Sequence, residues 1–285
     1  MIGAVLTCGI NAYQAVNPLR GTIPDAEHFG ARLMDYRARG DWSGKVRILL
    51  DRAAHRQAIR DAIGEGVARV PVGGTFVLHF SGHGTQAPDT TGDEGDHLDE
   101  ALCPYDLDPA TYWPGGLLSD DALAAALPRD RLTWLIVDAC HSGTASRSGV
   151  MGSRGVPYPG VMPKTSRAVR MRDVLARSEA PVILFAACES TQTAADFFES
   201  GCTRCQSGDA TVVEIPPAVI GYHGALTMSL LSRLWQTPTL GAGLTFEGLA
   251  DGVRQWFAGR PFSQRPTFEA TGGARLTQTV LGGLR

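Results

Sequence analysis

The sequence has little net charge and almost no lysine. Its 26 Lys and Arg residues against 29 Asp and Glu leave a formal net charge of −3, and Lys45 and Lys164 are its lysines. A chain with so small a net charge creates no overall field that would draw it to nucleic acid or to an anionic membrane. No apolar run approaches the about 20 residues of a membrane-spanning helix. We therefore expect no nucleic-acid partner and no membrane partner.

Cysteine is also scarce, with six residues in 285. This density is too low for a disulfide scaffold, so we expect a cytoplasmic protein with reduced thiols. The apolar start lacks the positive leading residues and the small-residue cleavage site of a signal peptide, and we interpret it as a buried strand. Cys202 and Cys205 have the spacing of a metal-ligand pair but no second pair, so zinc, an ordinary hairpin and redox-labile thiols remain alternatives there.

Apolar runs typical of strands alternate with helical patterns along most of the chain. This order predicts an α/β fold with a mostly parallel sheet that carries helices on its faces. The strands are expected at residues 2–9, 46–50, 75–81, 132–139 and 181–187, with a last edge strand at 265–270. The helices are expected at residues 25–39, 52–70, 224–235 and 246–257, and Ser119 is expected to cap a further short helix.

Three segments interrupt this alternation. Residues 84–118 are acidic and rich in turn residues, residues 144–178 are rich in Gly and Pro, and residues 200–217 look like an inserted hairpin. Long irregular loops in a compact domain are usually functional or disordered. The sequence shows no repeat and no internal linker, so we expect residues 1–285 to form a single domain.

Two of the expected strands end in short turns with reactive side chains. The turn HFSGHG places His83 after one strand, and the turn DACHSG places Cys140 after another. A thiol becomes a strong nucleophile when an imidazole accepts its proton, and the imidazole later protonates a leaving amine. Because we expect these two strands to be neighbours, we predict that His83 and Cys140 form a catalytic dyad.

Both turns contain glycine (Gly82 and Gly84 in the first, Gly143 in the second), which lets the backbone bend sharply and approach a substrate. The backbone N–H groups of Gly84 and Cys140 are expected to hold the oxygen of a carbonyl under attack, as an oxyanion hole does. A cysteine, a base and an oxyanion hole together predict acyl transfer, most simply peptide hydrolysis, and this chemistry needs no organic cofactor.

Both turns resemble the catalytic motifs of metacaspases, within the caspase-like clan of cysteine peptidases, and the likeness is to the prokaryotic metacaspase or orthocaspase type. The histidine precedes the cysteine by a spacing similar to that of the caspase signature. Further segments are similar to the family in the right order over most of the chain: LRGTIPDAEHF, DEALCPYD, LLSDDAL, FAACESTQTAAD and GALTMSLL. The resemblance implies a caspase-like three-layer sandwich around a central, mostly parallel six-stranded sheet.

The resemblance also implies what the site recognises, because metacaspases are similar to caspases in fold but cut after Arg or Lys rather than Asp. By motif match, Asp25, Ser81 and Asp138 would line the pocket for that side chain. A partly buried guanidinium needs carboxylate partners, and two aspartates supply paired hydrogen-bond acceptors. We therefore expect an endopeptidase that cuts peptide or protein substrates after Arg, with Lys as an alternative.

Many metacaspases require calcium, and the matching positions here are Asp99, Asp120 and Asp121. Carboxylate oxygens are the ligands that Ca²⁺ prefers. Arg147 stands where the family often has a further aspartate. The resemblance therefore leaves a calcium requirement open.

The segment 144–178 carries seven basic residues against one acid. It offers arginines to an Arg-specific pocket, so we expect self-processing within it. These arginines are Arg147, Arg154, Arg167, Arg170, Arg172 and Arg177. We expect no N-terminal pro-region and almost nothing after the last expected strand, so regulation would come from the chain's own loops or from a partner. The alternatives are a non-catalytic caspase-like scaffold, a partner-activated zymogen and a peptide ligase that uses the same dyad; we expect a monomer.

Overall fold

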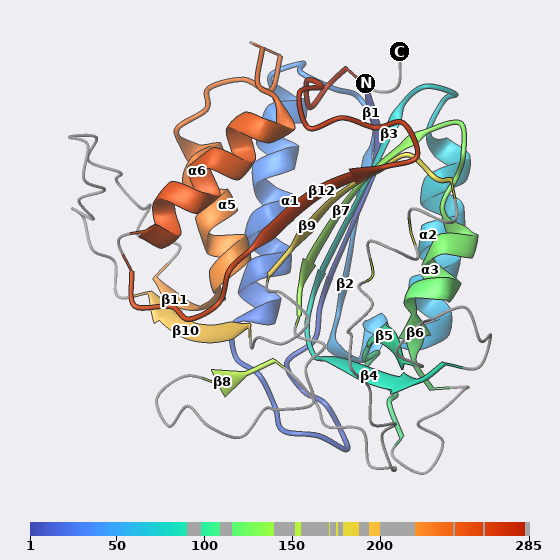
Figure 1. Ribbon diagram of the computed structural model, residues 1–285, viewed down its shortest axis with the longest axis vertical. Helices are drawn as coiled ribbons and strands as arrows, with labels where there is room; N and C mark the ends of the chain where they lie inside the picture. The colour runs from blue at the N-terminus through green and yellow to red at the C-terminus, as the bar shows by residue number, and fades with distance from the viewer. Residues whose placement is uncertain are drawn as a thin grey trace.

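A six-stranded sheet forms the centre of the computed structural model (Figure 1). The structure describes residues 1–89, 98–108, 116–139, 152–154, 171, 175, 179–187, 194–199, 220–241, 243–258 and 260–282. The strand order is β12-β9-β7-β3-β1-β2, and every pair is parallel except β12 with β9. The strands are β1 (Ile2–Gly9), β2 (Lys45–Leu50), β3 (Thr75–Ser81), β7 (Leu132–Asp138), β9 (Val182–Ala186) and β12 (Thr267–Thr271). The predicted mostly parallel sheet and its last edge strand are confirmed.

Helices cover both faces of this sheet. One face carries α1 (Thr22–Ala38), α5 (Ala225–Trp235) and α6 (Phe246–Ala258), and the other carries α2 (Arg56–Arg69) and α3 (Asp120–Ala126) (Figure 1). Trp134 and Ile136 of β7 pack into one apolar cluster, whereas Leu135 and Val137 pack into the other. Successive side chains of a strand point to opposite faces, so an unbroken apolar run needs a layer of helices on each face. Within the described part of the chain, none of the helices is long and apolar enough to cross a membrane.

The prediction of one helix over residues 52–70 was wrong at its start. The chain first forms a 3-10 turn, η1 (Asp51–Ala54), and α2 follows it. His55 separates the two in an extended conformation, and its Nδ1 accepts a hydrogen bond from the Ala58 N–H at 3.2 Å. A side chain that caps the first turn fixes where a helix begins. The Ser119 cap predicted for the short helix α3 is confirmed.

Two small sheets lie near the end of the central sheet where the parallel strands finish (Figure 1). They contain β4 (Gly84–Pro88), β5 (Leu98–Leu102) and β6 (Leu118–Ser119), and β8 (Gly152–Ser153), β10 (Ala195–Glu199) and β11 (Gly221–Gly224). The segment 84–118 is therefore not irregular throughout, because its first part alternates buried and half-buried residues and pairs with β5. The predicted hairpin at 200–217 and most of the segment 144–178 lie outside the described residues.

Candidate active site

The two strands that precede the predicted dyad are neighbours in the sheet. β3 and β7 pair in parallel, and Ser81 lies opposite Asp138 at their carboxyl ends. His83 follows β3 by two residues and is 2% exposed. Cys140 follows β7 by two residues and lies outside the described residues. The expected adjacency of the strands is confirmed, and it brings their ends to one edge of the sheet.

Hydrogen bonds hold His83 through its ring and its backbone. Nε2 of the ring lies 2.7 Å from the carbonyl oxygen of Asn17. The His83 N–H donates to the Tyr13 hydroxyl oxygen at 2.9 Å, and the two rings lie 4.8 Å apart. Because a carbonyl oxygen only accepts, the proton of the neutral imidazole resides on Nε2, and Nδ1 carries the lone pair. Nδ1 is buried and makes no hydrogen bond of normal geometry within the described residues.

The buried position of His83 also sets its charge. Burial lowers the pKa of the imidazole, and the backbone groups of Asn17 and Arg154 oppose this effect only in part. The ring is therefore neutral near neutral pH and suited to accept a proton. His79 differs, because its ring nitrogens lie 2.9 and 3.0 Å from the hydroxyls of Thr7 and Thr227. Burial lowers the pKa of His79 to about 4, as expected for a packed core histidine.

The three residues predicted to line a pocket surround a side chain of the chain itself, Arg154. Nη2 of Arg154 donates to Asp25 Oδ2 at 3.0 Å, and Nη1 donates to Ser81 Oγ at 2.6 Å. Nη1 also donates to the Asp138 carbonyl oxygen at 3.0 Å, and the Asp138 carboxylate lies 3.4 Å from it. The Arg154 side chain is fully buried. Residues of α1, β3 and β7 thus form one polar site around a guanidinium.

Two further residues complete this site and were missed by the sequence analysis. Asp196 of β10 accepts a hydrogen bond from Arg154 Nη2 at 2.9 Å. His223 of β11 lies 3.0 Å from Asp25, measured from Nδ1 to Oδ1. Both residues belong to a small peripheral sheet, which the periodicity of the sequence did not predict. Asp196 is nevertheless the last residue of the segment FAACESTQTAAD, which was the available signal.

A glycine and a helix start close the pocket around the guanidinium. The N–H of Gly224 lies 3.2 and 3.0 Å from the two carboxylate oxygens of Asp25. A Cβ on Gly224 would collide with Asp138 Oδ2 and with the Arg154 guanidinium, so a larger residue does not fit. Asp138 Oδ2 also accepts a hydrogen bond from the N–H of Thr227 at 2.7 Å. Thr227 lies in the first turn of α5, where the helix dipole favours a nearby negative charge.

Three carboxylates around one guanidinium leave the pocket with excess negative charge. Burial raises the pKa of the Asp138 carboxyl to about 6, although Arg154 attracts its charged form. Burial also acts to raise the pKa of Asp25, but Arg154 and His223 outweigh it, so the pKa of Asp25 is lowered. For Arg154, burial disfavours the charge, and the surrounding carboxylates outweigh it and raise the pKa. The pocket therefore favours a bound cation.

The backbone of Arg154 is held as well as its side chain. β8 directly precedes Arg154 and pairs antiparallel with β10, and the Arg154 N–H donates to the Ala194 carbonyl oxygen at 3.4 Å. The Arg154 carbonyl oxygen accepts the N–H of Gly84 at 2.9 Å, the amide predicted for the oxyanion hole. Since Gly84 follows His83 directly, this carbonyl lies beside the predicted base.

The residues predicted for calcium lie on β5 and at the start of α3. Asp99 and Asp120 are buried, and the Asp120 carboxylate accepts the N–H groups of Glu100 and Asp121 at 3.3 and 3.0 Å. Ca²⁺ takes about six to eight oxygen ligands. Among the residues that the structure describes, no group of three or more His, Cys, Asp or Glu is arranged to hold a metal ion. The described residues therefore do not form a calcium site by themselves, and calcium stays a prediction.

Two of the six cysteines lie within the described residues, Cys8 and Cys103, and both are buried free thiols. Burial raises the pKa of Cys8 to about 12 and raises the pKa of Cys103 as well. A thiol with so high a pKa stays protonated and is a poor nucleophile. Neither of these two cysteines is therefore an alternative to Cys140 as the predicted nucleophile.

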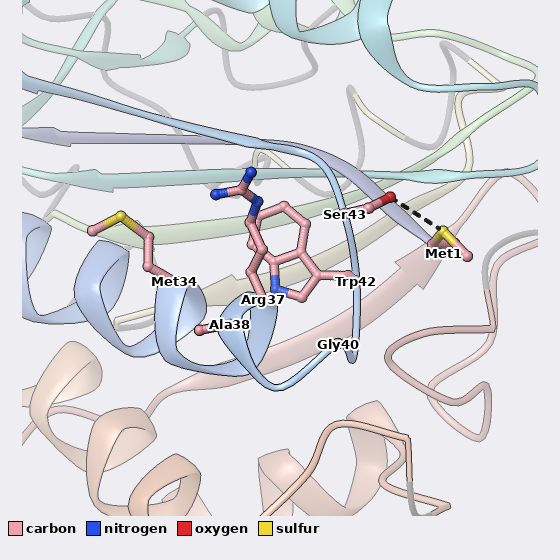
Figure 2. A pocket seen from close by; sticks show the side chains of 7 residues that line it. All are labelled: Met1, Met34, Arg37, Ala38, Gly40, Trp42 and Ser43. Atoms are coloured by element: carbon pink, nitrogen blue, oxygen red, sulfur yellow. Dashed lines mark hydrogen bonds between the residues drawn. The ribbon is translucent and has the colours of Figure 1, made fainter.

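A surface hollow of about 540 Å³ lies at the other end of the sheet (Figure 2). Its lining includes Met1 at the start of the chain, and Met34 and Trp42 at the end of α1 and beyond it. β1 begins at this end and finishes at Gly9, which lies opposite Ser81. The hollow is therefore a full strand length away from the acidic pocket and takes no part in it.

Comparison with known proteins identifies relatives over most of the chain. The family model described as caspase domain matches residues 2–276. Metacaspase-1 of Mycosarcoma maydis is 28% identical over 93% of this chain and 69% of its own length. Metacaspase-1B of Aspergillus niger is 26% identical over 92% of this chain, which spans 63% of that relative. A solved structure from Geobacter sulfurreducens matches the fold with a TM-score of 0.67, at 24% identity and over 99% of both chains.

Proposed function

This chain is a metacaspase-like member of the caspase-domain family of cysteine peptidases, and on that premise we propose that it cuts peptide bonds after arginine. The observation that carries the proposal is the buried guanidinium of Arg154, which makes four hydrogen bonds within the acidic pocket. A pocket that fits this side chain of its own chain fits the same side chain of a substrate. Lysine is the weaker alternative, because its compact ammonium lacks the planar fork that reaches several acceptors at once.

We assign the nucleophile to Cys140 and the base to His83. The thiol proton passes to Nδ1 of His83, and the thiolate attacks the carbonyl carbon of the substrate arginine. The oxyanion that forms then accepts hydrogen bonds from the backbone N–H groups of Gly84 and Cys140. The C–N bond breaks as the imidazolium protonates the leaving amine, which leaves a thioester on Cys140. Water, deprotonated by His83, hydrolyses the thioester and releases the new carboxylate and the thiol.

The surroundings of His83 support this assignment. Its Nε2 is oriented by the Asn17 carbonyl oxygen at 2.7 Å, which leaves Nδ1 to accept a proton. The neighbouring Gly84 amide already donates to a backbone carbonyl oxygen at 2.9 Å. The residues proposed as base and oxyanion donor thus lie beside the pocket that holds Arg154, and this arrangement supports the proposal of cleavage after arginine.

We also propose that the chain processes itself within residues 144–178 and works as a monomer. The segment contributes the arginine that now fills the pocket, so it reaches the proposed site. Occupation of the pocket favours a zymogen over a permanently open peptidase. The bound arginine gives no support to the alternative of a non-catalytic scaffold that binds no arginine.

Fluorogenic peptides that end in Arg, Lys or Asp before the reporter test the proposal, each with calcium and with a chelator. Wild type is expected to cleave the Arg reporter best and the Asp reporter not at all. Cys140→Ala is expected to abolish cleavage, whereas Cys202→Ala, at a cysteine outside both motifs, is the matched control. Preferred cleavage after Asp, or full activity in Cys140→Ala, would refute the proposal. Product masses separate hydrolysis from peptide ligation.

A further inference from the structure

Arg154 fills the acidic pocket with its side chain and reaches the oxyanion donor with its carbonyl. We infer that the Arg154–Gly155 peptide bond is the chain's own cleavage site, and that Arg154 closes the pocket to other substrates while it stays bound there. This inference rests on the proposed function and names the residue through which the chain restrains and processes itself.

The side-chain contacts of Arg154 are those expected of a bound substrate arginine. Its two terminal nitrogens meet Asp25 and Asp196 on one side and Ser81 and Asp138 on the other. These partners come from α1, β3, β7 and β10, which converge at the carboxyl edge of the sheet. The pocket is therefore built by the fold, and the arginine enters it from a separate segment between β7 and β9.

The backbone of the segment runs as a peptide substrate would. Gly152 and Ser153 form β8, which adds an antiparallel strand to β10. Strand addition to a sheet edge is a recurring mode of peptide binding, in which main-chain hydrogen bonds align the peptide and pockets select its side chains. Here the selected side chain is Arg154, directly after the paired residues. Its carbonyl is thereby placed on the Gly84 amide, one residue from the base.

Arg154 is the arginine of the segment 144–178 that lies within the described residues. Arg147, Arg167, Arg170, Arg172 and Arg177 lie outside them. In the sequence, Arg154 is followed by Gly155, a residue without a side chain. The bond after Arg154 is therefore the one that the structure assigns.

The covalent step balances as ordinary hydrolysis. The Cys140 thiolate attacks the Arg154 carbonyl carbon, and the C–N bond to Gly155 breaks while His83 protonates the departing Gly155 amine. One water molecule then attacks the thioester and gives its proton to His83. The products are a new carboxylate at Arg154, a new amine at Gly155 and the regenerated thiol. No oxidant, reductant or further reactant is needed.

Occupation of the pocket by the same chain predicts a low activity before cleavage. A tethered group competes at an effective concentration of about 1 mM or more, so a peptide at about 0.1 mM is outcompeted by about tenfold. Cleavage removes the peptide link on one side of Arg154 and lets the segment leave the pocket. Activity is therefore expected to rise as self-cleavage proceeds.

Mass spectrometry of the intact protein after long incubation tests the cleavage site. Wild type is expected to yield fragments 1–154 and 155–285, and Cys140→Ala is expected to stay whole. Gly155→Pro is expected to block the cut, because the bond to a proline nitrogen has no N–H and is held rigidly. Cleavage after another arginine, or an uncut wild type that hydrolyses the Arg reporter, would overturn the inference and leave the proposed function standing.

The occupation of the pocket is tested by comparing Arg154→Ala with the uncut Gly155→Pro protein on the Arg reporter. Arg154→Ala is expected to be at least about tenfold more active. Arg129→Ala in the Gly155→Pro background is the matched control, because the Arg129 side chain is 73% exposed. Equal rates for Arg154→Ala and Gly155→Pro would overturn the inference.

Arg154→Ala removes the guanidinium that pairs with three buried carboxylates, which could make this variant fold poorly. A binding measurement tests the inference in that case. Propylguanidinium, the arginine side chain without its backbone, is expected to raise the melting temperature of Cys140→Ala/Arg154→Ala and not that of Cys140→Ala. An equal shift in both proteins would show an open pocket and overturn the inference. If binding follows the expected pattern while every variant is inactive on all reporters, the pocket assignment holds and the proposed peptidase activity fails.

Discussion

Asp196 offers the sharpest test of how the pocket recognises a guanidinium. Its Oδ1 accepts hydrogen bonds from Arg154 Nη2 at 2.9 Å and from the Gly21 N–H at 3.0 Å, while Oδ2 accepts the Arg20 N–H at 3.0 Å. Both carboxylate oxygens are thus used as acceptors. Asp196→Asn keeps the shape of the side chain but replaces one acceptor by a donor. In either orientation one of these N–H groups then faces another donor.

The size of the effect follows from these contacts. A hydrogen bond to a charged group contributes about 1.5–3 kcal/mol, and a neutral one about 0.5–1.5 kcal/mol. If the oxygen of the substituted amide keeps facing the guanidinium, the hydrogen bond remains but the attraction between the two opposite charges is lost, and if it turns away, the whole charged bond is lost. We therefore expect guanidinium binding to weaken by about 1–3 kcal/mol, or about 5- to 150-fold.

Propylguanidinium titrated into the Cys140→Ala/Arg154→Ala protein, followed by NMR, measures this loss without interference from turnover or from Arg154. The matched control is Glu199→Gln, an acid-to-amide change on the same strand at a carboxylate that pairs with Arg260. The control is expected to leave the Kd unchanged. An Asp196→Asn protein that binds propylguanidinium as tightly as its parent would refute the role assigned to Asp196.

Three other variants test the architecture of the site. In a denaturant titration, Gly224→Ala is expected to lower the free energy of unfolding by about 1–3 kcal/mol, because the new Cβ would collide with Asp138 and Arg154. Gly64→Ala lies in open space on α2, and this control is expected to raise the free energy of unfolding by about 0.5–1 kcal/mol. Because burial raises the pKa of Asp138 to about 6, the folded chain binds this proton at a higher pH than the unfolded chain, and the contribution of Asp138 to stability falls as the pH rises through 6. Asp138→Asn is therefore expected to flatten the profile of melting temperature between about pH 4 and pH 6, the range between the pKa of the unfolded and of the folded carboxyl, and an unchanged slope there would contradict this sign. Tyr13→Phe removes the hydroxyl that holds the His83 N–H and the Cys103 carbonyl, so kcat is expected to fall with KM unchanged, and a raised KM alone would speak against a role at the base.

The central sheet was predictable because its strands are encoded locally. The apolar runs of β3 and β7 are buried along their whole length, and the sequence indicates both of them without any tertiary information. The helix over residues 52–70 was less predictable, since the apolar periodicity of α2 does not mark its true start. The His55 cap decides that boundary through a single hydrogen bond.

For the candidate site, the sequence by itself determined which residues and which chemistry to test. It identified His83 and Cys140 as the dyad to test, Gly84 as an amide donor, and Asp25, Ser81 and Asp138 as an acidic pocket, because these residue types follow strand ends or resemble a family motif. The structure brings the three pocket residues together and places Gly84 beside the base. The position of Cys140 lies outside the described residues and stays a prediction.

Only the tertiary structure decided which arginine fills the pocket and which further acid binds it. Arg154 is 129 residues from Asp25 and 42 from Asp196 along the chain, and both pairs are joined by hydrogen bonds, of 3.0 and 2.9 Å. Local periodicity carries no information about contacts over such separations, because they depend on how the peripheral strands pack against the sheet edge. The sequence gives no reason to choose one of the six arginines of the segment, and the reason to choose Arg154 is its burial among three carboxylates in the structure.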